Sequence, residues 1–187
     1  MRLAYALTAL ATLSLTACGQ VNLLGTERTG AAAIEGFDDP LETEVVVNTF
    51  AYERPRLLVR GSADPSFRAA FSKGEGTTPI LYQLYIKTSS EDWMRWESVR
   101  YQVAGAVRSA DLDQIGTDVE CHESKCSHYE TVGTLIGRDD LDAIAQGAAP
   151  VTFRLDSGRF TDDRDVSVDP AEVRVFLAAV DSVRTPR

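Results

Sequence analysis

Hydrophobic and polar residues alternate along several short segments of the chain. In residues 98–103, Val99, Tyr101 and Val103 fall on one side of an extended chain, and polar residues fall on the other. A period of two is typical of strands that bury one face, so we expect a largely antiparallel sheet. The other segments with strand-like patterns are 80–87, 128–136 and 151–156.

Two segments follow the helical period instead. Asp139 is expected to cap a short helix near 139–146. Asp169 and Pro170 are typical of the N-cap and first position of a longer C-terminal helix, 170–183. This second helix carries one apolar stripe, formed by Val173, Phe176, Leu177, Val180 and Val183. Because such a stripe must be buried, we expect it to pack on a sheet, and an exposed partner-binding helix is the alternative. The predicted fold class is α+β, mainly antiparallel β, either a sandwich or a curved sheet.

The first residues have the pattern of an export signal. Arg2 precedes an apolar stretch, 3–15, that is well short of the roughly 20 residues needed to cross a bilayer as a helix. A basic start followed by such a stretch is typical of a secretory signal peptide. We therefore expect residues 1–17 to be removed, and not to remain as a transmembrane anchor.

The apolar stretch ends in Leu15-Thr16-Ala17-Cys18, which resembles the lipobox of bacterial lipoproteins. The resemblance covers these residues and does not extend downstream. It implies cleavage before Cys18, a diacylglycerol on its thiol and acylation of its new amine, for example by palmitate. Several acyl chains would anchor the protein stably. Gly19 stands where Asp would retain such a protein in the inner membrane, which implies the outer membrane, facing the periplasm. An ordinary signal peptide that ends near a cysteine is the alternative.

The composition after Cys18 predicts a tether followed by one domain. Residues 18–42 are rich in Gly, Ala, Thr and acidic residues without a sustained period. As a flexible coil, this segment would span about 25–30 Å. The first strand-like run is 45–47, so we expect a single globular domain over 43–187.

The formal net charge of −9 narrows the classes of partner. Nucleic-acid binding needs clustered basic residues to contact phosphates, and an acidic chain is also repelled by an anionic membrane surface. The expected partners are therefore the membrane, through the lipid on Cys18, and an envelope protein or glycan. The charge itself is most simply explained by solubility.

Two cysteines and both histidines of the chain lie together, at Cys121, His122, Cys126 and His128. An oxidising envelope favours a disulfide between Cys121 and Cys126. Thiolates and imidazoles also suit zinc or copper, so a metal site on these residues is the alternative. A third interpretation is a cysteine nucleophile activated by a neighbouring histidine, which would require a free thiol.

Three aromatic residues near a predicted hairpin are candidates for ligand binding. Tyr85, Trp93 and Trp96 could form a platform for a glycan or a peptide. Aromatic residues in such positions also pair across strands, which is the structural alternative.

No sequence motif points to catalysis. Gly74-Glu75-Gly76 lacks the third glycine of a phosphate loop, and the acidic run 162–165 lacks the ligand spacing of a calcium loop, so both are expected to be turns. We predict a non-catalytic binding or structural module of the envelope that needs no cofactor. The alternatives are an envelope metal-binding protein that uses the Cys/His segment and a carboxylate-dependent hydrolase of envelope polysaccharide.

Overall fold

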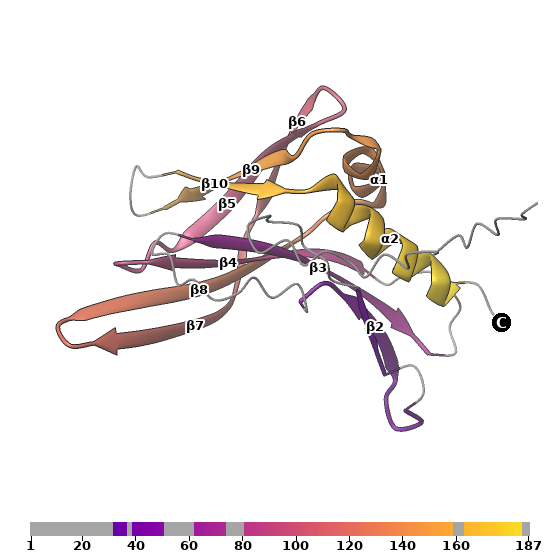
Figure 1. Cartoon of the computed structure of the whole chain (residues 1–187), viewed down its shortest axis with the longest axis horizontal. Coiled ribbons are helices and arrows are strands. Elements are labelled where there is room, and N and C mark those ends of the chain that lie inside the picture. Colours follow the sequence, from indigo (N-terminus) through magenta and orange to yellow (C-terminus); the bar gives the residue numbers. More distant parts are fainter. Residues whose placement is uncertain (1–31, 37–38, 51–61, 74–80, 159–162, 185–187) are drawn as a thin grey trace, which may run out of the picture.

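Two antiparallel sheets and two helices enclose a shared hydrophobic core (Figure 1). The structure is a computed structural model that describes residues 32–36, 39–50, 62–73, 81–158 and 163–184. The predicted fold class, α+β with mainly antiparallel β structure, is confirmed. The predicted signal peptide, Cys18 and the Gly74–Gly76 turn lie outside the described residues.

The larger sheet has six strands, and each neighbouring pair is antiparallel. In spatial order these strands are β1 (Ala33–Glu35), β2 (Glu44–Asn48), β3 (Ala63–Ser72), β4 (Leu81–Ser90), β8 (Lys125–Leu135) and β7 (Asp113–His122).

The smaller sheet has four strands. In spatial order these are β10 (Arg164–Val168), β9 (Val151–Ser157), β5 (Trp96–Val103) and β6 (Ala106–Asp111). The two-residue turn between β5 and β6 requires positive φ at both positions, 50° at Ala104 and 79° at Gly105. Glycine meets this requirement without strain, and such turns match the twist of the strands on either side.

One chain segment joins the two sheets at a corner. Only Leu112 separates β6 from β7, and its backbone N–H donates to the carbonyl of Glu97 at 2.8 Å. The chain therefore leaves the smaller sheet and enters the larger one almost without interruption. The β4–β5 connection also crosses between the sheets, so these consecutive strands do not form a hairpin.

The strands predicted from alternation are confirmed. Residues 98–103 lie in β5, where Val99, Tyr101 and Val103 are buried and their neighbours are more exposed. The patterns at 80–87, 128–136 and 151–156 correspond to β4, β8 and β9.

The predicted tether contains a strand, which corrects the start of the folded region. Strand β1 pairs with β2, with Ile34 opposite Val47. The segment 33–35 is too short to show a period of its own, and pairing with an existing strand supplies the hydrogen bonds that hold it. Folded structure therefore begins before residue 43.

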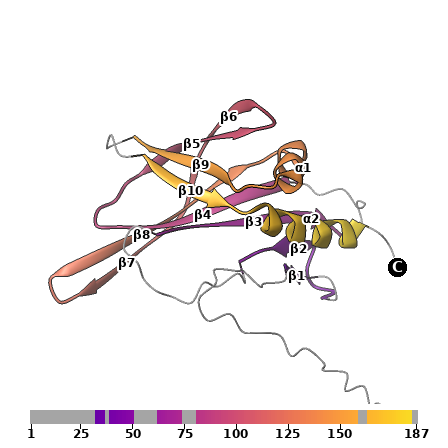
Figure 2. The same ribbon diagram turned by 45° about the horizontal axis from the view of Figure 1, so that its top comes forward.

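Helix α2 (Pro170–Arg184) confirms the predicted C-terminal helix. Asp169 caps it, because its Oδ1 accepts the backbone N–H of Ala171 at 2.8 Å. The apolar stripe packs into the core, where the rings of Phe176 and Phe67 stack at 5.5 Å. The helix covers the inner face of β2 and β3 beside the smaller sheet (Figure 2).

Helix α1 (Arg138–Gln146) is present, but the predicted cap is wrong. The N-cap is Gly137, whose carbonyl accepts the N–H of Leu141 at 3.1 Å, and no side chain caps this end. Asp139 instead lies within the first turn, where its negative charge is favoured by the helix dipole.

The β7–β8 hairpin extends beyond the rest of the domain, at the end opposite α2 (Figure 1). The far part of β7 is exposed on both faces, and β7 forms an edge of the larger sheet. This hairpin carries the two cysteines and His122 at its outer end and one wall of the candidate site at its base. His128 lies between them, where β8 still pairs with β4.

Candidate binding site

The β4–β5 connection is fastened to β8 by one buried carboxylate. Glu130 is 1% exposed, and its two oxygens accept the backbone N–H groups of Met94 at 2.7 Å and Arg95 at 2.9 Å. Arg95 has a φ of 54°, an unfavourable conformation for a residue with a side chain. Hydrogen bonds to an ionised acceptor are among the stronger ones in proteins, so Glu130 stabilises this bent connection.

A hollow of about 250 Å³ opens where this connection meets the base of the hairpin. Glu130 contributes a buried polar group, Trp93 is half-buried, and the remaining side chains are exposed. The lining residues are Trp93, Arg95, Gln114, Thr117 and Glu130.

A β-bulge shapes the wall that β7 contributes. The register with β8 shifts between Gln114 and Gly116. The side-chain amide of Gln114 donates to the carbonyls of Gly116 at 2.8 Å and Thr131 at 3.0 Å. Beyond the bulge, Thr117 lies directly opposite Glu130, so the two side chains share the inner face of the hairpin. Bulges are common beside functional sites because they redirect side chains.

Two polar atoms on β4 and β8 have no hydrogen-bond partner among the described residues. Ser90 and His128 are directly opposite each other on β4 and β8. The Oγ of Ser90 and the Nδ1 of His128 are buried, and neither has a hydrogen-bond partner in the part of the chain that the structure describes. The His128 ring contacts the Trp93 ring edge to face, at 4.7 Å. Buried polar atoms of this kind call for an explanation, because leaving them unbonded costs free energy.

The second tryptophan belongs to the core behind this site. Trp96 is 4% exposed, and its Nε1 donates to Thr88 Oγ1 at 3.0 Å. The guanidinium of Arg164 lies over the indole at 5.4 Å and donates to the carbonyl of Ser89. Burial lowers the pKa of Arg164, and the nearby Glu130 carboxylate partly offsets this effect.

The three aromatic residues of the predicted platform lie in different places. Trp93 lines the hollow, whereas Trp96 is buried. Tyr85 lies on the opposite face of β4 from Thr88, beside Phe50 at a ring distance of 5.4 Å. The expected hairpin between β4 and β5 would have brought the three together, and the crossing between sheets separates them.

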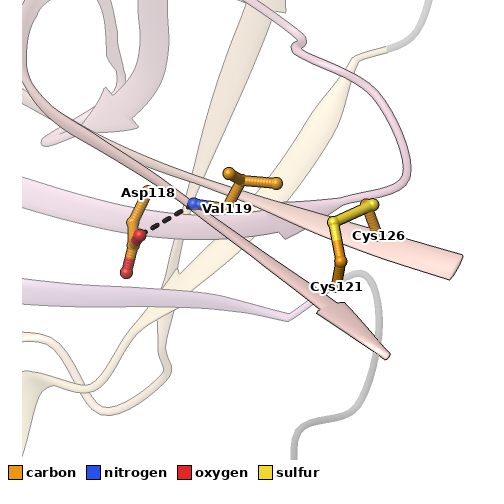
Figure 3. Close-up of a disulfide and its surroundings, with 4 residues drawn as sticks. All are labelled: Asp118, Val119, Cys121 and Cys126. Atoms are coloured by element: carbon orange, nitrogen blue, oxygen red, sulfur yellow. Dashed lines mark hydrogen bonds between the residues drawn. A yellow bond between two sulfur atoms is a disulfide. The ribbon is translucent and has the colours of Figure 1, made fainter. Parts of the chain in front are cut away.

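The predicted disulfide is present. Cys121 and Cys126 face each other across the far end of the β7–β8 hairpin, and their sulfur atoms are bonded (Figure 3). Val119 and Asp118 precede Cys121 on β7, and the carboxylate of Asp118 accepts the N–H of Val119 at 2.8 Å (Figure 3). Neither Cys121 nor Cys126 can act as a free nucleophile while this bond is intact.

The two histidines lie on opposite faces of the hairpin. His128 is opposite Val119 on the inner face, while His122 is exposed and contacts the Glu120 carboxylate at 3.0 Å. Strand alternation therefore separates imidazoles that are close in sequence. Within the described ranges, no group of three or more His, Cys, Asp or Glu side chains is arranged to hold a metal ion.

Part of the acidic run 162–165 forms ion pairs on the smaller sheet. Asp165 accepts two hydrogen bonds from Arg154, and Asp163 lies 3.6 Å from Arg100. Asp162 lies outside the described residues.

The sequence analysis missed Arg95, Gln114, Thr117 and Glu130. Glu130 offered a usable signal, since it is a charged residue at a position whose strand neighbours Val132 and Thr134 are buried. The other three are polar residues at exposed positions, and only the corner between the sheets brings them together.

The chain matches no protein-family profile, no curated protein and no solved structure. In the part of the chain that the structure covers, no helix has the length and apolar character needed to span a bilayer.

Proposed function

We propose that this chain is a lipid-anchored lipoprotein of the bacterial cell envelope whose β domain is a non-catalytic binding module. The disulfide between Cys121 and Cys126 carries the proposal, because such bonds persist in oxidising compartments outside the cytoplasm. The sequence Leu15-Thr16-Ala17-Cys18 independently points to the same compartment through its likeness to a lipobox. Gly19 favours the outer membrane.

Binding is favoured over catalysis by the way the hollow is built. Its carboxylate, Glu130, already accepts two backbone N–H groups and lies almost fully buried. A general acid or base must exchange a proton with a bound substrate, whereas this group is engaged in holding the β4–β5 connection. The other lining groups offer hydrogen bonds and an aromatic surface.

Acylation is tested by expressing the full chain in a Gram-negative host with radiolabelled palmitate. Label should appear on the protein and be lost in Cys18→Ala, which also blocks release of the signal peptide. Separation of inner and outer membranes should place the wild type in the outer membrane. Gly19→Asp should shift it to the inner membrane, whereas the matched variant Gly19→Ser should not. Equal labelling of Cys18→Ala and the wild type would contradict the lipid anchor.

The non-catalytic assignment has its own test. Incubation of the protein with envelope polysaccharide should produce no new reducing ends. Release of reducing ends that is lost in Glu130→Gln would show a hydrolase and overturn this part of the proposal.

A further inference from the structure

The hollow beside Trp93 contains groups of mixed charge that together favour a neutral ligand. Arg95 and Glu130 contribute opposite charges, and Gln114 and Thr117 are uncharged. An anion would meet the Glu130 carboxylate and a cation would meet the Arg95 guanidinium, so neither is favoured by the lining as a whole. An apolar ligand would displace water from the exposed side chains of Arg95, Gln114 and Thr117 without replacing its hydrogen bonds.

Trp93 adds an aromatic surface that is held in place. Its ring is half-buried and contacts His128 edge to face at 4.7 Å. The face of an aromatic ring is electronegative and attracts groups with a small positive charge, such as the C–H groups of a sugar ring. Hydroxyl groups at the edge of the same sugar can then bond to the polar side chains around the indole.

The polar wall is organised before any ligand binds. The amide nitrogen of Gln114 is occupied by two carbonyl groups, which directs its oxygen elsewhere as an acceptor. Glu130 is fixed by two backbone N–H groups. Groups held in this way lose little conformational freedom on binding, which favours affinity.

Ser90 and His128 are close to Trp93, although neither lines the hollow. Ser90 is 7% exposed, and its Oγ and the Nδ1 of His128 have no partner among the described residues. His128 shares the inner face of β8 with Glu130 and touches Trp93. Both atoms are sealed from solvent, so a ligand in the hollow makes its hydrogen bonds with the lining side chains and not with these two groups.

We infer that the hollow lined by Trp93, Arg95, Gln114, Thr117 and Glu130 binds one ring of a neutral saccharide. The volume of 250 Å³ is below the roughly 300–1,000 Å³ of sites for drug-sized ligands, which fits a single ring. The inference rests on the proposed function, because it names the ligand class of that binding module.

The test uses the full chain in a polyoxyethylene detergent, since sugar-based detergents would compete. The probes are maltose, cellobiose and N,N'-diacetylchitobiose, with inorganic phosphate and tetramethylammonium as charged comparisons. Binding is followed by saturation-transfer NMR and by tryptophan fluorescence. We expect saturable binding of at least one disaccharide and of neither charged probe.

Matched variants assign the binding to the hollow. Trp93→Ala should lower the affinity about tenfold or more, which corresponds to about 1.4 kcal/mol. Thr117→Val, which keeps the shape and removes the hydroxyl, should lower it several-fold. Tyr85→Ala, an aromatic on the other face of the sheet, and Thr152→Val, at an exposed strand position, should bind as the wild type does. Circular dichroism checks that each variant is folded, and Thr117→Val decides the question if Trp93→Ala does not fold.

Three results would overturn the inference. The first is the absence of saturable binding to all three disaccharides. The second is unchanged disaccharide binding by the folded Trp93→Ala and Thr117→Val variants. The third is saturable binding of a charged probe that the same variants abolish. If the chain is acylated at Cys18 but binds no disaccharide, only this inference is contradicted. If the chain binds a disaccharide but is not acylated, the proposed lipid anchor is contradicted instead.

Discussion

At the scale of single residues, Glu130 shows how one buried charge can be accommodated. The carboxylate lies between the two sheets, where desolvation is costly unless the charge is hydrogen-bonded. Two backbone N–H groups satisfy it, and Arg164 lies close enough to interact electrostatically. The same contacts position Trp93, which directly precedes the two residues that Glu130 holds.

Replacing Glu130 is therefore expected to destabilise the domain. In Glu130→Ala the N–H groups of Met94 and Arg95 lose their acceptors, and we expect a loss of roughly 2–6 kcal/mol, because each buried unbonded group costs about 1–3 kcal/mol. Glu130→Gln retains a carbonyl acceptor and should lose less. Urea unfolding measures both values. Equal stability of Glu130→Ala and the wild type would show that the carboxylate does not hold the connection.

At the scale of elements, the two helices differ in how they begin. Helix α2 has a side-chain cap at Asp169, whereas α1 begins after Gly137 without one. Both sequences contain an aspartate near the start, so composition alone does not separate the two cases. The backbone conformation at the helix start decides which aspartate can reach the free N–H groups.

The difference can be measured with a matched pair of variants. Asp169→Ala should lower the free energy of unfolding by about 1 kcal/mol, because it removes an N-cap hydrogen bond. Asp139→Ala removes only a charge near the helix dipole and should cost about 0.3–0.5 kcal/mol. Chemical denaturation compares the two, and a larger effect at Asp139 would contradict the assignment of the caps.

The disulfide stabilises an element that has little support from the core. The far part of β7 is exposed on both faces and the facing residues of β8 are only half-buried, so the hairpin end can open without unfolding the domain. In Cys121→Ser/Cys126→Ser, amide exchange near the hairpin end should speed up by an amount equivalent to roughly 2 kcal/mol or less, the chain-entropy value for so short a loop. The melting temperature of the domain should change little. A large fall in that temperature would show instead that the hairpin is coupled to the core.

At the scale of the whole molecule, α2 completes a core that neither sheet could close alone. Phe176 is fully buried and contacts Phe67 and Tyr82 of the larger sheet. Phe176→Ala should lower the stability by about 3–5 kcal/mol, as expected for a large cavity in a core. Val175→Ala, on the exposed side of the same helix, should change it by about 0.5 kcal/mol or less. Thermal or urea unfolding measures the difference, and similar values for the two variants would mean that α2 is not packed as described.

Local patterns were sufficient to predict most of the elements. The alternation of Val99, Tyr101 and Val103 predicts β5, and the stripe through Phe176 predicts the buried face of α2. Such patterns can be read locally, because side chains repeat on one face every two residues in a strand and about every 3.6 residues in a helix. Strands β3, β6, β7 and β10 were not predicted, and neither was β1, whose three residues are too few to display a period.

The candidate site could be predicted only in part. Trp93 was identified as a candidate, but it was grouped with Tyr85 and Trp96, which lie elsewhere. That grouping assumed that consecutive strands form a hairpin. Glu130 and Thr117 are adjacent through β7–β8 pairing, and this long-range contact leaves no local mark in the sequence.

The sequence by itself determined the fold class, the C-terminal helix and the cysteine pair, because each depends on local periodicity or on scarce residue types. The tertiary structure decided which strands share a sheet, where the chain crosses between sheets and which side chains meet at the hollow. Strand pairing is set by contacts between distant segments, whose free energy depends on the whole packed core. For the same reason His122 and His128, close in sequence, lie on opposite faces, while Trp93 and Gln114 share one site.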